Sequence, residues 1–186
     1  MGPTRIIYIR HAEKPVKGVS EGVSSSGTTD SKSLTTRGWQ RAGALVRYFC
    51  PLKADAGGVS MTPGTIFAAD VDAADPSQRP IETVTPLVDY MKTQKDIPFI
   101  TSYAKEDHQD LTDDVLKREG VVLVSWEHKQ IPALVACLPD APQTPASWPD
   151  DRFDVCWILD RTANGWNFSQ EPQMLLAGDQ LNPIPE

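Results

Sequence analysis

Two runs of apolar, mostly β-branched residues restrict the folds open to this chain. One covers residues 6–9 and the other covers residues 121–126. A strand with one face in water alternates apolar and polar residues, whereas a strand that helices cover on both faces is apolar throughout. Ionisable residues follow both runs: Arg10 and His11 after the first, and residues 127–129 after the second. The pattern predicts an α/β fold around a mostly parallel sheet.

Segments with helical spacing lie between the apolar runs and support this class of fold. Thr35 can cap a helix whose apolar residues recur at helical spacing up to Phe49. A second helix begins near Arg79, since Pro80 suits a first helical turn. Further helices are predicted at about residues 111–118 and through residues 131–138. Shorter strands are predicted at residues 65–69, 97–100, 153–159 and 166–168, the last two joined as a hairpin through Asn164 and Gly165.

The length of 186 residues suits a single domain over residues 1–186. Residues 16–33 are rich in Gly, Ser, Thr and Lys, which predicts a long mobile loop that is either a surface insertion or a substrate lid. Residues 173–186 end with two prolines in their last four positions and are expected to form an irregular tail. We expect the loops at 16–33, 70–78 and 101–110 to frame any pocket.

The charge of the chain limits its partners. A formal net charge of -7 argues against nucleic-acid and anionic membrane surfaces as ligands, although a local basic pocket could still bind a small anion. The sequence contains neither an apolar run of about 20 residues nor a signal-like amino terminus. Three dispersed cysteines are interpreted as buried thiols rather than a disulfide framework or metal site. These features favour a cytoplasmic protein.

The predicted topology brings together four residues that could act on a phosphate group. Two predicted strands deliver Arg10, His11 and His128 to one edge of the sheet, and the helix after a third strand begins at Arg79. A neutral imidazole can attack phosphorus, and guanidinium groups bind phosphoryl oxygens in pairs of hydrogen bonds. Metal binding by the two histidines is disfavoured, because two neighbouring arginines repel a divalent cation.

Four segments resemble motifs of the histidine phosphatase superfamily, the phosphoglycerate mutase-like proteins. They are residues 10–15 (Arg-His-Ala-Glu-Lys-Pro), residues 34–42 (Leu-Thr-Thr-Arg-Gly-Trp-Gln-Arg-Ala), Arg79 followed by Thr83, and residues 124–128 (Val-Ser-Trp-Glu-His). They occur in the order found in the family and span most of the chain. The resemblance implies a three-layer α/β/α sandwich, here extended by a C-terminal β-hairpin.

The resemblance also implies a role for each residue that matches a motif. His11 would be the nucleophile that becomes transiently phosphorylated, and Arg10, Arg79 and His128 would bind the phosphoryl group. No metal or cofactor is implied. The partners would be a small phosphorylated substrate and inorganic phosphate as product.

Two departures from the family pattern concern the surroundings of these residues. The sequence Asp-Pro-Ser-Gln at residues 75–78 replaces the usual Ser-x-Leu-x before the second arginine, and Lys129 replaces a glycine after the second histidine. The family takes its proton donor from a variable position. Glu106 is the preferred candidate because it follows the third strand, with Asp107 and Glu13 as alternatives.

These features predict a metal-independent phosphatase that hydrolyses a phosphate monoester through a phosphohistidine on His11. Two alternatives stay open. One is a module of the same fold that binds a phospho-ligand without turnover, and the other is a phosphomutase. The sequence indicates neither the identity of the substrate nor the oligomeric state.

Overall fold

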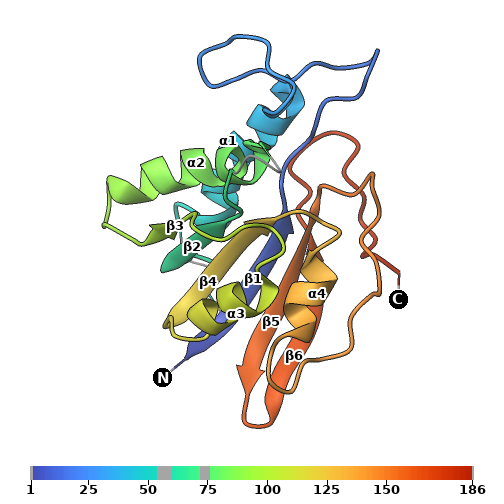
Figure 1. Ribbon diagram of the computed structural model, residues 1–186. Coiled ribbons are helices and arrows are strands. Elements are labelled where there is room, and N and C mark those ends of the chain that lie inside the picture. The colour runs from blue at the N-terminus through green and yellow to red at the C-terminus, as the bar shows by residue number, and fades with distance from the viewer. Residues whose placement is uncertain (1, 54–59, 72–75, 186) are drawn as a thin grey trace.

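Six strands form one sheet within residues 2–53, 60–71 and 76–185, which are the residues described by the computed structural model (Figure 1). The strands are β1 (Pro3–Arg10), β2 (Thr65–Ala68), β3 (Phe99–Ile100), β4 (Gly120–Trp126), β5 (Val155–Thr162) and β6 (Gly165–Pro172). The helices are α1 (Thr36–Phe49), α2 (Arg79–Lys92), α3 (His108–Val115) and α4 (Ile131–Ala136). None of these helices is long and apolar enough to cross a membrane.

The sheet is mostly parallel, as predicted. Its strand order is β3-β2-β4-β1-β5-β6, and β3, β2, β4 and β1 all run in the same direction. The C-terminal hairpin of β5 and β6 adds two antiparallel strands beside β1. β1 therefore lies inside the sheet, between β4 and β5 (Figure 1).

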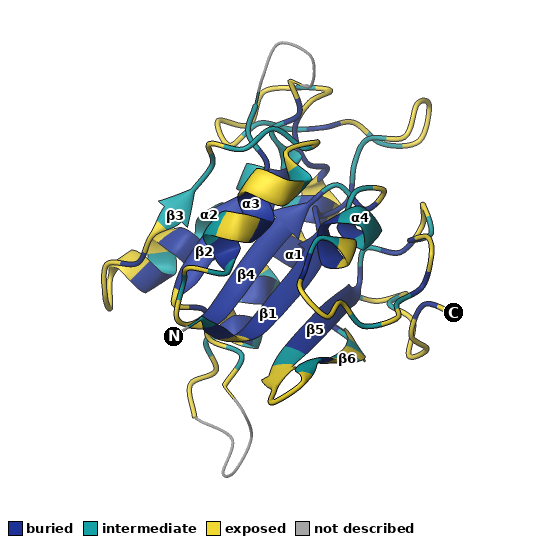
Figure 2. Ribbon diagram, turned by 60° about the horizontal axis from the view of Figure 1, so that its bottom comes forward, coloured by how far each residue is buried: buried dark blue, intermediate teal, exposed yellow. Residues whose placement is uncertain are grey.

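Helices cover both faces of the sheet and complete three layers. Ile7 and Ile9 of β1 face one core with α1 and α2, whereas Ile6 and Tyr8 face the other core with α3 and α4. These four side chains are at most 1% exposed, which explains why the strand is apolar throughout rather than alternating. In Figure 2 the central strands are coloured as buried along most of their length. The predicted three-layer sandwich is confirmed.

Several predicted boundaries were wrong, and hydrogen bonding accounts for the largest differences. β5 and β6 pair continuously from Val155↔Pro172 to Thr162↔Gly165, so both strands extend beyond the apolar stretches that predicted them. α3 begins at His108, about three residues earlier than predicted. β3 is shortened to Phe99 and Ile100.

The cysteine prediction was correct only in part. All three cysteines are free, and Cys156 is buried in the sheet. Cys50 and Cys137 are only partly buried, because each lies at the C-terminal end of a helix rather than on its inward face.

The loop at residues 16–33 and the tail both follow irregular paths that are anchored to the rest of the molecule. Isolated bridges join Val16 to Ser20 and Val23 to Thr29 within the loop. The Trp39 indole N–H donates to the carbonyl of Val23 at 2.7 Å, which ties the loop to α1. Residues 173–185 form no helix or strand.

Candidate active site

The topology brings His11 and His128 to the same edge of the sheet. Arg10, the last residue of β1, pairs with Trp126, the last residue of β4. The backbone N–H of His11 donates to the carbonyl of Trp126 at 3.0 Å. Because His128 follows Trp126 by two residues, both histidines lie at the carboxyl ends of neighbouring parallel strands, as the sequence predicted.

The start of α2 is held against the same edge by side-chain hydroxyl groups. Thr83 accepts from the N–H of Ala12 at 2.8 Å and donates to the carbonyl of Arg79 at 2.7 Å. Ser125, near the end of β4, donates to the carbonyl of Pro80 at 2.9 Å. These bonds fix the amino terminus of α2, and with it Arg79, beside the residues that follow β1.

His11 is buried and has one ring nitrogen bonded to the backbone. Its side chain is 5% exposed, and Nδ1 lies 2.8 Å from the carbonyl oxygen of Ala12. A carbonyl oxygen only accepts, so Nδ1 carries the proton and Nε2 keeps its lone pair. Burial lowers the pKa of His11 well below its ordinary value, and the nearby Arg10, Arg79 and His128 lower it further. The imidazole is therefore uncharged at neutral pH.

Arg10 has one nitrogen anchored and one edge without a partner. Its Nη1 donates to the carbonyls of Pro149, Asp150 and Arg152 at 3.1, 2.8 and 3.1 Å, and its guanidinium lies 3.7 Å from the ring centre of Phe153. Burial lowers the pKa of Arg10 to about 10, so the group stays charged at neutral pH.

The unpartnered edge of Arg10 has the geometry of an anion site. Nε and Nη2 are buried and have no hydrogen-bond partner among the described residues. These two N–H groups point the same way and match a pair of phosphoryl oxygens. Leaving buried donors unsatisfied is costly, so a bound anion would stabilise this arrangement.

His128 is bonded on one side and has no partner on the other. Its Nε2 lies 2.6 Å from Oδ1 of Asp150, while Nδ1 is buried without a partner among the described residues. Burial lowers the pKa of His128, and the charge of Arg10 adds to this, whereas Asp150 opposes it. The hydrogen bond to His128 lowers the pKa of the Asp150 carboxyl in turn.

Arg79 lies at the first position of α2 and is half-buried. Its Nη1 donates to the carbonyl of Ser31 at 3.2 Å, and its charge contributes to the lowered pKa of His11. Asp75, the first residue of the departure from the family pattern before Arg79, lies outside the described residues. A phosphate-binding role for Arg79 stays a prediction.

The three candidate proton donors have contacts away from the histidines. Glu106 is exposed and lies 3.8 Å from Lys105. Asp107 accepts from the N–H of Ala104 at 2.8 Å. Glu13 accepts from Arg41 at 2.9 Å. Within the described part of the chain, none of the three carboxylates forms a hydrogen bond with either histidine.

Sequence reasoning missed Asp150, the carboxylate that does contact a candidate catalytic histidine. Asp150 follows the Pro-rich stretch at residues 139–149 and stands beside Asp151. Nothing in its local sequence distinguishes it from other surface acids. The one available signal was position, because Asp150 lies just before β5, which pairs with β1.

A buried ion network supports the loop that carries His11. Arg41, which is 2% exposed, donates to Glu13 at 2.9 Å and to Asp179 at 2.7 Å. Burial works against the charge of Arg41, but the hydrogen bonds to Asp179 and Glu13 outweigh it and raise its pKa. Gly38 allows the start of α1 to approach the same loop closely, since a Cβ there would lie 2.7 Å from the backbone carbonyl oxygen of Glu13. The network joins α1 and the tail to the residue two positions after His11.

The residues of this site do not form a cage for a metal ion. Among the described residues, no group of three or more His, Cys, Asp or Glu side chains is placed to hold a metal. The buried, unpartnered edge of Arg10 and the charge of Arg79 favour an anion instead.

Comparison with known proteins identifies the fold. No family model and no curated protein matches this chain. A mutant phosphoserine phosphatase from Entamoeba histolytica, in complex with phosphoserine, has 11% identity and a TM-score of 0.54, covering 92% of this chain and 98% of its own. An Escherichia coli protein described as an alpha-ribazole-5'-P phosphatase has 13% identity and a TM-score of 0.51, covering 89% and 95%. The chain thus has the phosphoglycerate mutase-like fold of the histidine phosphatases.

Proposed function

We propose that this protein is a metal-independent phosphatase that hydrolyses a small phosphate monoester through a phosphohistidine on His11. One observation carries the proposal: a neutral, buried His11 stands beside the unpartnered Nε and Nη2 edge of Arg10. The similar structures are named as phosphatases, and one of them is a complex with phosphoserine, which supports the same class of reaction.

The reaction would proceed in two displacements. Nε2 of His11 attacks phosphorus, the ester P–O bond breaks, and the leaving oxygen takes a proton from an acid. Water then attacks the phosphohistidine, releases inorganic phosphate and restores His11. Throughout, the carbonyl of Ala12 would hold the Nδ1 proton, which keeps Nε2 aimed at phosphorus and stabilises the ring as it gains positive charge.

Glu106 is the proposed source of the proton. Its segment is attached to the end of β4, since the Trp126 indole donates to the carbonyl of Lys105 at 3.0 Å. The Lys105 ammonium also lies 3.6 Å from Glu127, the residue before His128. The exposed side chain of Glu106 would swing from this anchored segment toward the leaving group.

Phosphate release from a panel of phosphate monoesters, in buffer containing a chelator, tests the proposal. We expect release to be unaffected by the chelator, because Arg10, Arg79 and the imidazolium form of His128 supply the positive charge. A phosphomutase would instead return the phosphoryl group to its substrate and release little phosphate.

A binding module without turnover is the second candidate function. It is favoured by the lack of a hydrogen bond between either histidine and Glu106, Asp107 or Glu13 within the described residues. Tight binding of vanadate with no phosphate release from any ester in the panel would support this module and contradict the phosphatase.

Asp150 is proposed to orient the His128 ring and to favour its protonated form. When a dianionic phosphoryl group binds, the imidazolium form of His128 can donate from Nδ1, and Asp150 favours that form. Asp150→Asn keeps an acceptor for Nε2 but removes the charge. We expect the loss of activity on the alkaline side to begin about one pH unit lower, with about a tenfold drop in kcat/KM at neutral pH.

A pH profile of kcat/KM checks this expectation. Asp113→Asn, an exposed carboxylate on α3 that accepts from Gln109, serves as the matched control and should leave the profile unchanged. If Asp150→Asn also leaves it unchanged, Asp150 has no part in the charge of His128.

A further inference from the structure

A cavity of about 680 Å³ adjoins the candidate site. Three segments form its walls: residues within 13–21, which follow His11, the start of α1 at residues 35–37, and the segment of Asp150, Asp151 and Phe153. This volume is in the range of pockets that bind small ligands. It is far larger than a phosphoryl group requires.

Two of the lining residues contact Arg10 and the two histidines of the site. The Phe153 ring lies 6.2 Å from the His11 ring, centre to centre, and supports the guanidinium of Arg10. Asp150 is bonded to His128. A phosphate ester bound through its phosphoryl group at His11 and Arg10 would therefore have this cavity beside it.

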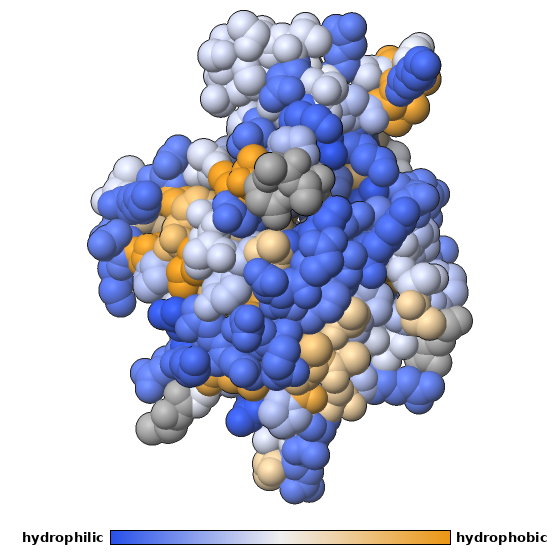
Figure 3. Space-filling model, in the orientation of Figure 1, coloured by the Kyte–Doolittle hydropathy of each residue, from blue (hydrophilic) through white to orange (hydrophobic). Residues whose placement is uncertain are grey.

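Part of the cavity lining is apolar. Val16 and Val19, which are 51% and 83% exposed, line it together with Phe153. In Figure 3 an apolar patch, coloured orange, lies at the upper right, where Figure 1 shows the chain after β1 turning back. Exposed valines beside a cavity favour contact with an apolar part of a ligand.

The charged residues of the lining are mostly acidic. Four carboxylate residues and two basic residues line the cavity, and one of the basic residues, Arg37, is already bonded to Glu13 at 3.2 Å. Lys14, the other, is close enough to Asp150 to lower the pKa of that carboxyl. Glu21 and Asp151 are both exposed. The field in the cavity therefore opposes a second anionic group and favours a cationic one.

We propose that this cavity binds the leaving group of the substrate, and that this group is apolar with a positive charge. The inference rests on the proposed function only in placing the phosphoryl group at His11 and Arg10. It predicts a monophosphate ester of a cationic, partly apolar alcohol and disfavours bisphosphates and phosphorylated carboxylic acids.

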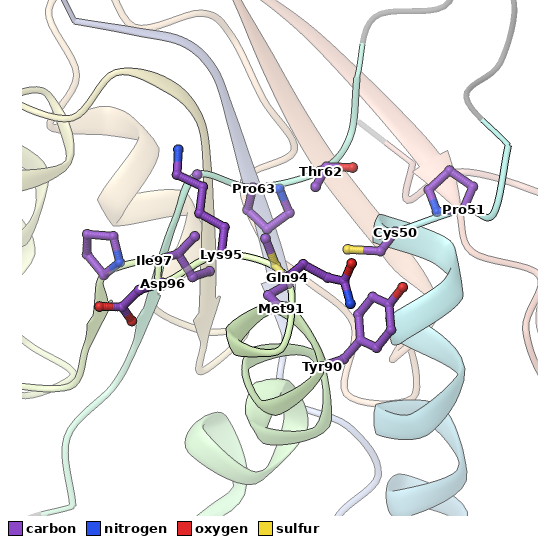
Figure 4. A pocket seen from close by; sticks show the side chains of 12 residues that line it. Cys50, Pro51, Thr62, Pro63, Tyr90, Met91, Gln94, Lys95, Asp96 and Ile97 are labelled. Carbon is purple, nitrogen blue, oxygen red and sulfur yellow. The ribbon is translucent and has the colours of Figure 1, made fainter.

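A second cavity, of about 570 Å³, does not compete for this role (Figure 4). Cys50 and Tyr90, near the C-terminal ends of α1 and α2, line it, together with residues near β3 such as Ile97. It shares no residue with the site. Burial raises the pKa of the Cys50 thiol, so that thiol is a poor nucleophile at neutral pH.

Two aryl phosphates whose para substituents carry opposite charges test the inference: 4-(aminomethyl)phenyl phosphate and 4-(carboxymethyl)phenyl phosphate. Binding is measured by calorimetry on the His11→Ala variant, and kcat/KM on the unmodified protein. We expect the cationic ester to be preferred about tenfold, because exposed charge pairs each contribute modestly. The preference should shrink at about 0.5 M salt, where such charges are screened.

Charge removal in the cavity supplies the decisive comparison. The double variant Glu21→Gln with Asp151→Asn should reduce the preference to about twofold or less, since both exposed carboxylates are lost. The control double variant, Asp89→Asn with Asp113→Asn, removes two exposed carboxylates outside the cavity and should keep the tenfold ratio.

The two proposals can fail separately. Equal binding of the two esters, or a ratio that the cavity variant leaves unchanged, overturns the leaving-group inference while phosphate release still supports a phosphatase. Selective binding of the cationic ester without any phosphate release supports the cavity assignment and overturns the phosphatase.

Discussion

Replacing His11 with alanine is expected to lower kcat by about 10⁴-fold or more. The variant loses the Nε2 lone pair that would attack phosphorus, and the remaining cations can bind the ester but cannot form the covalent intermediate. After a denaturing quench at alkaline pH with a labelled ester, the unmodified protein should carry label that alkali preserves and acid releases, as a phosphohistidine does. The His11→Ala variant should carry none.

His108→Ala is the matched control for this experiment. His108 begins α3, and its Nε2 lies 2.8 Å from Oε1 of Gln130 rather than near the site. We expect this variant to retain both turnover and label. Full activity of His11→Ala would contradict the assignment of the nucleophile.

The stability of the protein should also report on His11, independently of turnover. Its pKa is depressed in the folded state, so below about pH 6.5 the unfolded chain binds a proton that the folded chain does not. The free energy of unfolding should therefore fall as the pH drops below that value. His11→Ala should reduce this dependence, which urea unfolding at several pH values would measure.

The second large effect is expected for Arg41→Met, which should lower the free energy of unfolding by about 3–5 kcal/mol. The substitution keeps much of the side-chain volume but removes the buried cation of the Glu13 and Asp179 carboxylates, which then keep only the more exposed Arg37, at 3.2 and 3.6 Å. Asp179 is held in its charged form by Arg41, which lowers its pKa against the effect of burial. Urea unfolding monitored by tryptophan fluorescence would measure the loss.

Two comparisons separate the ion network from a general effect on α1. Arg47→Met removes an exposed arginine of the same helix, whose Nη1 bonds to the Tyr90 hydroxyl at 3.0 Å, and should cost less than about 1 kcal/mol. Adding Glu13→Gln and Asp179→Asn to Arg41→Met should recover part of the loss, because no buried carboxylate is then left unpaired. An Arg41→Met variant as stable as Arg47→Met would show that the network contributes little.

Much of the fold could be read from local patterns. Residues 6–9 and 121–126 are apolar throughout because helices cover both faces of their strands, and the structure confirms both strands. Thr35 caps α1 as predicted, with its hydroxyl accepting from the N–H of Gly38 at 3.1 Å. Buried strands and helix caps depend on residues only a few positions apart, so periodicity and capping patterns in the sequence predict them directly.

The candidate site was predictable only where it follows strand ends. Arg10, His11 and His128 come directly after apolar strands, so their meeting at one edge follows from a parallel sheet. The anchoring of Arg10 does not follow, because its three carbonyl partners lie between 139 and 142 residues away in sequence. The Arg41–Asp179 contact spans 138 residues.

The stretch from Arg10 to Glu13 illustrates both what local sequence determines and what only tertiary packing decides. By itself the sequence determined that a strand ends there, that a histidine and an arginine follow its core, and that their chemistry suits phosphate. Only the tertiary structure decided that Glu13 belongs to a buried ion network, that Asp150 bonds to His128, and that a cavity opens beside Phe153. Those contacts depend on how distant irregular segments pack across the sheet edge, and no local periodicity encodes that packing.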